Sequence, residues 1–253
     1  MEQFPAEIRL PLTGSYRFGP AIADEANKWL ELIGSDMRLK GWKRLNSEID
    51  TGEKPTAILC RTNGSAMVHV MDALERGTKV ALPSAGPSDP MGTKQITALA
   101  TAAANLMAGR ATEHPELVAF KSWDDVREYA KEQDGADLAP FVRLIDEHGV
   151  DSILNACRRV VVEAQAELVV STAHRAKGRE WDVVLAADDF LPKDLRNGGL
   201  ENGQPVPPQQ PGELKLNYVV ATRGKMAFQR GGLRWVDKAL AQHRERNYED
   251  SPV

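Results

Sequence analysis

The chain has 253 residues, of which 42% are hydrophobic, and carries a formal net charge of −4. That length and composition are typical of a globular protein with a sizeable core. The slightly acidic net charge excludes a protein that coats nucleic acid through an overall basic surface, so any DNA contact has to come from locally placed Arg and Lys residues. The two cysteines, Cys60 and Cys157, exclude a disulfide framework and lack the spacing of a metal site. We therefore expect a protein of the reducing cytoplasm without a bound metal.

The first part of the chain predicts alternating strands and helices. Its first 20 residues lack the charged and apolar regions of a signal peptide. An extended strand or loop is expected over Ile8 to Arg17, and Pro20 suits the first turn of a helix that continues to Leu32. Thr56 to Cys60 (TAILC) is a short apolar run typical of a strand, and a helix with apolar spacing follows it. Thr78 to Leu82 predicts the next strand.

The pattern becomes helical between residues 93 and 164. Helix starts are expected at Ser122 and Asp137, because both precede runs with helical apolar spacing. The longest weakly polar stretch, Ile96 to Ala108, is interrupted by Thr and Asn residues and is shorter than the ~20 residues that a membrane span requires. We therefore expect a helical insertion and no contact with a membrane.

Strands and helices alternate again in the last third of the chain. The runs Glu167 to Thr172 (ELVVST) and Trp181 to Ala187 (WDVVLAA) have β-branched apolar centres that suit strands buried on both faces of a parallel sheet. A loop rich in Pro, Gly and Gln follows. The predicted order ends with a helix over Glu213 to Lys225, a strand over Ala227 to Arg230 and a closing helix over Leu233 to His243. The pattern indicates an α/β fold with a parallel sheet.

The segment from Ser171 to Asp182, STAHRAKGREWD, joins a strand end to a His, a Lys-Gly pair and an acidic residue before the next strand. Functional loops of α/β sheets occupy such carboxyl ends of strands. The segment resembles the motif T-x-H-x-x-K-G-x-E of UvrD/Rep-type superfamily 1 DNA helicases. Its continuation, DVVLAADDF, is similar to the F-box DNA helicase branch of that family.

Three further segments resemble motifs of the same family. ELKLNYVVATRGK, which ends at Lys225, is similar to E-x-x-L-x-Y-V-A-x-T-R-A-K, with one extra Val and with Gly224 where Ala is usual. LTGSYRFGPAIADEAN, which starts at Leu12, resembles L-x-x-S-[YF]-R-F-G-x-x-I-A-x-x-A-N. ILCRTN, which ends at Asn63, is similar to a strand that ends in R-T-N. The four segments occur in the order of the family and together span most of the chain.

The resemblance implies a second RecA-like motor domain, with a parallel sheet of the P-loop NTPase type and helices on both of its faces. Residues 1–92 and 165–253 would form this domain. Residues 93–164 would be a small helical insertion, at the place where these helicases have an accessory domain. The implied activity is that of an ATP-dependent DNA helicase or translocase with 3′ to 5′ polarity.

The resemblance also places residues at a nucleotide. In the family, two RecA-like domains enclose ATP, and the matching positions imply that Tyr16 stacks on adenine while Arg17 and Arg223 contact the γ-phosphate. A planar guanidinium supplied to the transferring phosphoryl group accelerates such reactions by about 10³- to 10⁵-fold. Gly178 would let the backbone approach the nucleotide, and Glu180 would contact the ribose or a phosphate-bound water.

A second set of matching positions touches single-stranded DNA in the family. It comprises five residues at the ends of two predicted strands: Arg61, Thr62, Asn63, Thr172 and His174. Small hydroxyl and amide side chains at loop ends can donate to phosphate oxygens without reading bases. The resemblance therefore implies that single-stranded DNA is a partner, bound with little sequence preference.

The chain has no recognisable phosphate-binding loop. Such a loop follows G-x-x-x-x-G-K-[ST], and the nearest segment, GPSDPMGTK from Gly86 to Lys94, has a glycine spacing one residue too long and reverses Thr and Lys. A strand that ends in the magnesium-binding acidic pair of the family is also missing. ATP and Mg²⁺ would therefore be held mainly by a first RecA-like domain, supplied in cis or in trans, and the chain alone is expected to be a poor ATPase.

Each functional assignment competes with a plain structural one. Arg17 and Arg223 could form ordinary surface ion pairs. Tyr16 could be a core aromatic, His174 a hydrogen-bonded structural histidine, and Lys177 a residue that holds its own loop. For the whole chain, the alternative is a non-catalytic module with a helicase-derived fold that binds DNA or a partner, or a regulatory subunit that completes another protein's ATP site.

Overall fold

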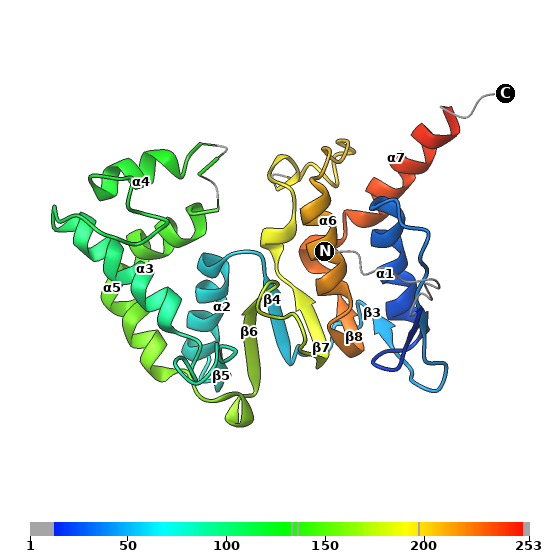
Figure 1. The fold of residues 1–253 in the computed structure, drawn as a ribbon, viewed down its shortest axis with the longest axis horizontal. Helices are drawn as coiled ribbons and strands as arrows, with labels where there is room; N and C mark the ends of the chain where they lie inside the picture. The colour runs from blue at the N-terminus through cyan, green and yellow to red at the C-terminus, as the bar shows by residue number, and fades with distance from the viewer. Residues whose placement is uncertain (1–12, 133, 136, 197, 250–253) are drawn as a thin grey trace, which may run out of the picture.

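The computed structural model describes residues 13–132, 134–135, 137–196 and 198–249 (Figure 1). Leu12, with which one helicase-like segment begins, and most of the extended segment expected from Ile8 lie outside these residues. The strands are β1 (Gly14–Ser15), β2 (Lys40–Gly41), β3 (Glu48–Ile49), β4 (Ala57–Cys60), β5 (Val80–Ala81), β6 (Leu168–Thr172), β7 (Trp181–Ala186) and β8 (Gly224–Gln229). The helices are α1 (Pro20–Leu32), α2 (Asn63–Glu75), α3 (Lys94–Met107), α4 (Trp123–Tyr129), α5 (Ala139–Arg159), α6 (Pro211–Ala221) and α7 (Val236–Glu249).

Six of the strands form one parallel sheet in the order β3-β8-β7-β4-β6-β5. The remaining two, β1 and β2, form a separate parallel pair. Helices cover both faces of the six-stranded sheet, so the predicted α/β fold is confirmed. The helices α3, α4 and α5 lie at one end of the molecule, beyond α2 and β5, whereas α1 and α7 lie at the other end (Figure 1).

The side chains of the central strand β4 alternate between two hydrophobic cores. Ile58 and Cys60 belong to the core that includes α2, α3 and α5. Ala57 and Leu59 belong to the core that includes α1, α6 and α7. All four are buried, as expected for a strand covered on both faces, because successive side chains of a strand point to opposite sides.

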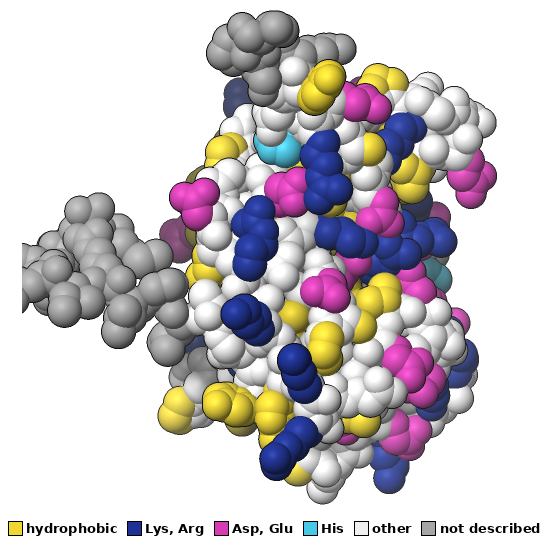
Figure 2. Space-filling view, turned by 90° about the vertical axis from the view of Figure 1, so that its right-hand side faces the viewer, with side chains coloured by type: hydrophobic (Ala, Val, Ile, Leu, Met, Phe, Trp, Pro, Cys, Tyr) yellow, Lys and Arg dark blue, Asp and Glu magenta, His cyan; other side chains and the backbone are white. Residues whose placement is uncertain are grey.

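The end of the molecule that carries α1 and α7 is held by aromatic and ionic contacts. Trp29 of α1 and Trp235 meet edge to face, with ring centroids 5.0 Å apart. At the surface, Asp237 pairs with Lys28 and with Arg230, each at 2.6 Å. Figure 2, which looks onto this end, shows Lys and Arg side chains interspersed with Asp and Glu. It therefore presents no broad patch of one charge.

The predicted insertion is helical, but one of its expected helix starts is wrong. Ser122 caps α4 as predicted, since its Oγ accepts from the Asp125 N–H at 3.2 Å. Asp137 does not cap α5, which begins at Ala139, because the Asp137 carboxylate pairs with Arg61 instead. The division into a motor domain and an insertion stays a prediction, since α3 and α5 share one core with α2. None of the described helices is both long and apolar enough to cross a membrane.

The boundary between α6 and β8 also differs from the prediction. The helix expected up to Lys225 ends at Ala221, where the Thr222 hydroxyl donates to the Tyr218 and Val219 carbonyls at 3.1 and 2.9 Å. Such side-chain bonds to the preceding turn compete with helical ones. β8 begins at Gly224, where a Cβ would lie 2.6 Å from the Ala227 carbonyl oxygen. An alanine at this position would therefore require the backbone to shift.

Candidate functional site

Three of the residues predicted to face a nucleotide meet at the amino ends of β7 and β8. The Trp181 N–H, at the start of β7, donates to the Arg223 carbonyl at 3.1 Å. Arg17, just before α1, reaches the same place, because its Nε donates to Glu180 Oε2 at 2.7 Å and its Nη1 to the Thr222 carbonyl at 3.0 Å. The structure thus brings Arg17, Glu180 and Arg223 together. We call this group the amino-edge cluster.

Arg223 is held by uncharged acceptors. Its Nε donates to the Val219 carbonyl at 2.9 Å, its Nη1 to the Arg179 carbonyl at 3.2 Å and its Nη2 to Thr222 Oγ1 at 2.9 Å. Burial, followed by the charge of Arg17, lowers the pKa of Arg223 to about 10, so the guanidinium is still protonated at neutral pH. Because burial penalises its charge, a bound anion would stabilise it.

Tyr16 is not a core aromatic, since 82% of it is exposed. Its ring lies 6.0 Å from that of Trp42 with an interplanar angle of 65°. The parallel pairing of β1 with β2 sets Ser15 opposite Gly41, which places the next residues, Tyr16 and Trp42, side by side. Trp42 could not be predicted from the sequence, because strands of two residues leave no periodic signal.

Gly178 lies in the exposed segment between β6 and β7. Its φ of 81° favours glycine, and a Cβ there would meet no atom within 4 Å. The backbone is therefore open to solvent, as an approach by a ligand requires. Lys177 is also exposed, and its two interpretations stay open.

The residues predicted to touch DNA gather at the opposite edge of the sheet. β4 and β6 pair with Cys60 opposite Thr172, so the segments that follow these strands start side by side at their carboxyl ends. All five residues line one pocket of about 540 Å³: Arg61, Thr62, Asn63, Thr172 and His174. We call it the carboxyl-edge pocket. Their roles toward DNA stay predictions.

Asp189, just after β7, shapes the turn that leads from β4 into α2. Its carboxylate accepts from the Arg61 N–H at 2.9 and 3.0 Å, from the Thr62 N–H at 2.9 Å and from the Thr62 hydroxyl at 3.2 Å. Thr62 Oγ1 in turn accepts from the Ser65 N–H at 3.1 Å and caps α2. This role of Asp189 could not be predicted from the sequence, because its partners are more than a hundred residues away.

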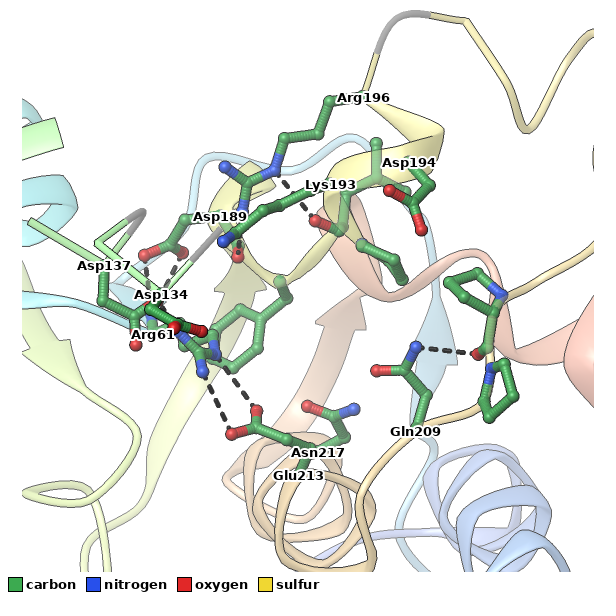
Figure 3. A pocket seen from close by; sticks show the side chains of 15 residues that line it. Arg61, Asp134, Asp137, Asp189, Lys193, Asp194, Arg196, Gln209, Glu213 and Asn217 are labelled. Atoms are coloured by element: carbon green, nitrogen blue, oxygen red, sulfur yellow. Dashed lines mark hydrogen bonds and ion pairs between the residues drawn. The ribbon is translucent and has the colours of Figure 1, made fainter. Parts of the chain in front are cut away.

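The Arg61 side chain is occupied by carboxylates (Figure 3). Its Nε and Nη2 each donate to Glu213 at 3.0 Å, and its Nη1 pairs with Asp137. The bonds to Glu213 are the largest cause of a raised pKa for Arg61. The predicted contact of this guanidinium with a DNA phosphate would therefore have to replace an existing ion pair.

Two further arginines, Arg175 and Arg179, anchor the segment between β6 and β7, which runs from the carboxyl edge of the sheet to its amino edge. Arg175 donates to the carbonyls of Pro83 and of Gly92, at 2.7 and 2.9 Å. Arg179 donates to Glu163 at 2.7 Å and to the Ser84 carbonyl at 2.9 Å. Both occupy variable positions of the motif, which explains why motif reasoning missed them.

The described residues contain no cluster of side chains typical of a resident metal ion. No group of three or more His, Cys, Asp or Glu side chains in the described ranges could hold one. Both cysteines are free and buried, and burial raises the pKa of the Cys60 and Cys157 thiols. A Mg²⁺ ion that enters with ATP is held by phosphate oxygens and one or two carboxylates, so its place stays a prediction.

A parallel six-stranded sheet covered by helices on both faces is consistent with a RecA-like α/β domain. No protein-family model matches the chain. Over 244 residues the chain is 28% identical to F-box DNA helicase protein 1 of Schizosaccharomyces pombe, an alignment that covers 88% of this chain and 27% of that protein. Over 238 residues it is 26% identical to F-box DNA helicase 1 of Gallus gallus, with 85% and 23% covered. The chain is thus distantly homologous to F-box DNA helicases and spans about a quarter of their length.

Proposed function

We propose that the chain is the second RecA-like motor domain of an ATP-dependent DNA helicase or translocase with 3′ to 5′ polarity. The amino-edge cluster is the observation that carries this proposal. Arg17 and Arg223 converge beside Glu180, and Arg223 keeps its charge among uncharged acceptors. Such a guanidinium is suited to the charge that develops on a transferring phosphoryl group. Distant homology to DNA helicases supports the same function.

The proposal divides the work between this chain and a first RecA-like domain, in cis or in trans. That domain holds most of ATP and the Mg²⁺, since no group of three or more His, Cys, Asp or Glu side chains in the described ranges could hold a metal ion. This chain supplies the two arginines, Glu180, the open backbone at Gly178 and the exposed ring of Tyr16 for adenine. At the other edge, the carboxyl-edge pocket binds the phosphates of a single DNA strand.

The test combines the chain with a first RecA-like domain that carries G-x-x-x-x-G-K-[ST]. ATP hydrolysis stimulated by single-stranded DNA is expected for the mixture and not for the chain alone. Arg223→Ala should lower the turnover by at least about 10³-fold while the chain stays folded. Arg158→Ala, which removes an exposed arginine of α5, is the control. Normal turnover in Arg223→Ala would contradict the proposal.

The second candidate is a non-catalytic module that binds DNA or a partner with the same fold. The ion pairs of Arg61 with Asp137 and Glu213 favour it, because a motor that exchanges phosphates needs donors that are not already bound to carboxylates. This candidate predicts strand or partner binding, but no ATP turnover when a first RecA-like domain is added.

A further inference from the structure

The carboxyl-edge pocket has two walls of different chemistry. One wall holds the ends of β4 and β6 with the start of α2, and it presents the polar residues already described. The other wall comes from the helical insertion. Its lining includes Leu99, Glu116, Tyr129, Asp134, Asp137 and Phe141. No motif pointed to these residues.

The charges of the two walls orient a nucleic-acid strand. Glu116 and Asp134 on the insertion wall are exposed carboxylates, which repel phosphates, whereas Asp137 on the same wall is paired with Arg61. The opposite wall contains Arg175, whose guanidinium donates to two uncharged carbonyls, so its positive charge attracts phosphates. A single strand in this pocket therefore turns its phosphates to the ends of β4 and β6 and its bases to the insertion.

Tyr129, at the end of α4, gives the insertion wall a fixed aromatic ring. The residue is half-buried and lines the pocket. Its ring packs against Phe120, with centroids 5.3 Å apart and an interplanar angle of 52°. Gly135 also lies close to the ring, since a Cβ there would be 2.8 Å from the Tyr129 Cδ1 atom. The ring is thus held before any ligand arrives, which lowers the entropic cost of stacking.

We propose that the helical insertion is the base-facing wall of a groove for single-stranded DNA, and that Tyr129 stacks on a base in it. The inference rests on the proposed function and gives the insertion a role in it. Stacking on an aromatic side chain tolerates every base, because every base has a π face. The arrangement therefore agrees with binding that has little sequence preference.

The test measures fluorescence anisotropy of the whole chain with two labelled oligonucleotides of equal length. One consists of thymidylates, and the other carries the same phosphates on abasic tetrahydrofuran units. Tyr129→Ala should weaken binding of the thymidylate strand by at least about fivefold and leave the abasic strand unchanged. Tyr129→Phe should bind as the parent does. Tyr248→Ala, which removes an exposed tyrosine of α7 at the other end of the molecule, is the control.

Each other outcome overturns the inference in a recognisable way. An equal loss on both strands means that Tyr129 only supports the insertion. No loss on either strand, together with weaker binding by Asn63→Ala, means that the strand binds at this edge without the insertion wall. If the parent chain binds neither strand, the proposed binding of single-stranded DNA is wrong as well.

Discussion

Arg223 at the amino edge of the sheet and Arg61 at its carboxyl edge lie in opposite electrostatic settings. At the amino edge, Arg223 donates to two carbonyls and a hydroxyl, and burial lowers its pKa. At the carboxyl edge, Arg61 donates to Glu213 and Asp137, and the bonds to Glu213 raise its pKa. A buried guanidinium among uncharged groups gains from an added anion, whereas a paired one must first give up its carboxylate. Arg223 could therefore accept a phosphate without giving up a carboxylate, whereas Arg61 would first have to exchange partners.

The largest effect is expected from Arg17→Ala at the amino edge. The change removes a guanidinium from the nucleotide side and leaves Glu180 without its partner at 2.7 Å. With a first RecA-like domain present, ATP turnover should fall by about 10³-fold or more, and Arg17→Lys should restore little, since an ammonium lacks the planar fork. Anisotropy should show unchanged affinity for single-stranded DNA. A matching loss of DNA affinity would show that the two edges do not act separately on ATP and DNA.

The next effect is expected from Asp189→Ala at the carboxyl edge. The change leaves the N–H groups of Arg61 and Thr62 without their acceptor, which should lower the free energy of unfolding by about 1–3 kcal/mol for each group that stays buried. Urea titration measures this loss, and DNA affinity should fall with it. Asp188→Ala removes the exposed neighbouring carboxylate and is the control. Equal stability of the two variants would show that Asp189 does not hold the turn.

A smaller effect, of opposite sign, is expected from Asp137→Asn. Releasing one carboxylate from Arg61 should raise the affinity for single-stranded DNA by up to about fivefold, the size of an exposed ion pair, and the gain should shrink as salt is added. Asp134→Asn is the matched control, because Asp134 lines the same pocket but is not one of the carboxylates that pair with Arg61. An equal gain in both variants would indicate general charge removal, without a special role for the ion pair.

The smallest effect is expected at Glu31, on α1. Arg244 donates to its carboxylate at 2.6 and 2.9 Å, and these bonds lower the pKa of Glu31. Because the folded pKa lies below the unfolded one, this stabilisation is present above the unfolded pKa and is lost as the pH falls through the folded pKa. Glu31→Gln should lower the free energy of unfolding by about 0.2–1 kcal/mol at pH 7, and the difference should vanish in acid. A difference that grows toward low pH would contradict a lowered pKa of Glu31. Neither ATP turnover nor DNA affinity should change in this variant.

Short-range patterns predicted most of the fold. The apolar run that ends at Cys60, the Pro20 helix start and the Ser122 cap all depend on neighbours in the sequence, and the structure confirms them. At Asp137 a short-range pattern gave a wrong prediction. Its side chain would suit a helix cap, but Arg61 lies close enough in the fold to take the carboxylate, and the helix starts later.

In the candidate site, too, some residues could be predicted from the sequence and others could not. Motif positions predicted which residues gather at each edge, because the loops between strands and helices carry the motifs. Trp42, Asp189 and the arginines at variable motif positions escaped prediction, because their contacts form between segments far apart in the sequence. Sequence spacing carries no information on such pairings. The roles of the motif residues toward ATP and DNA stay predictions.

The most direct test of separate edges measures ATP turnover and DNA affinity on the same two variants, Arg223→Ala and Asn63→Ala, each with a first RecA-like domain. The account predicts that Arg223→Ala loses turnover by at least about 10³-fold and keeps its Kd for single-stranded DNA. Asn63→Ala should raise that Kd and keep its kcat at saturating DNA. Loss of both properties in both variants, with folding intact, would contradict the account.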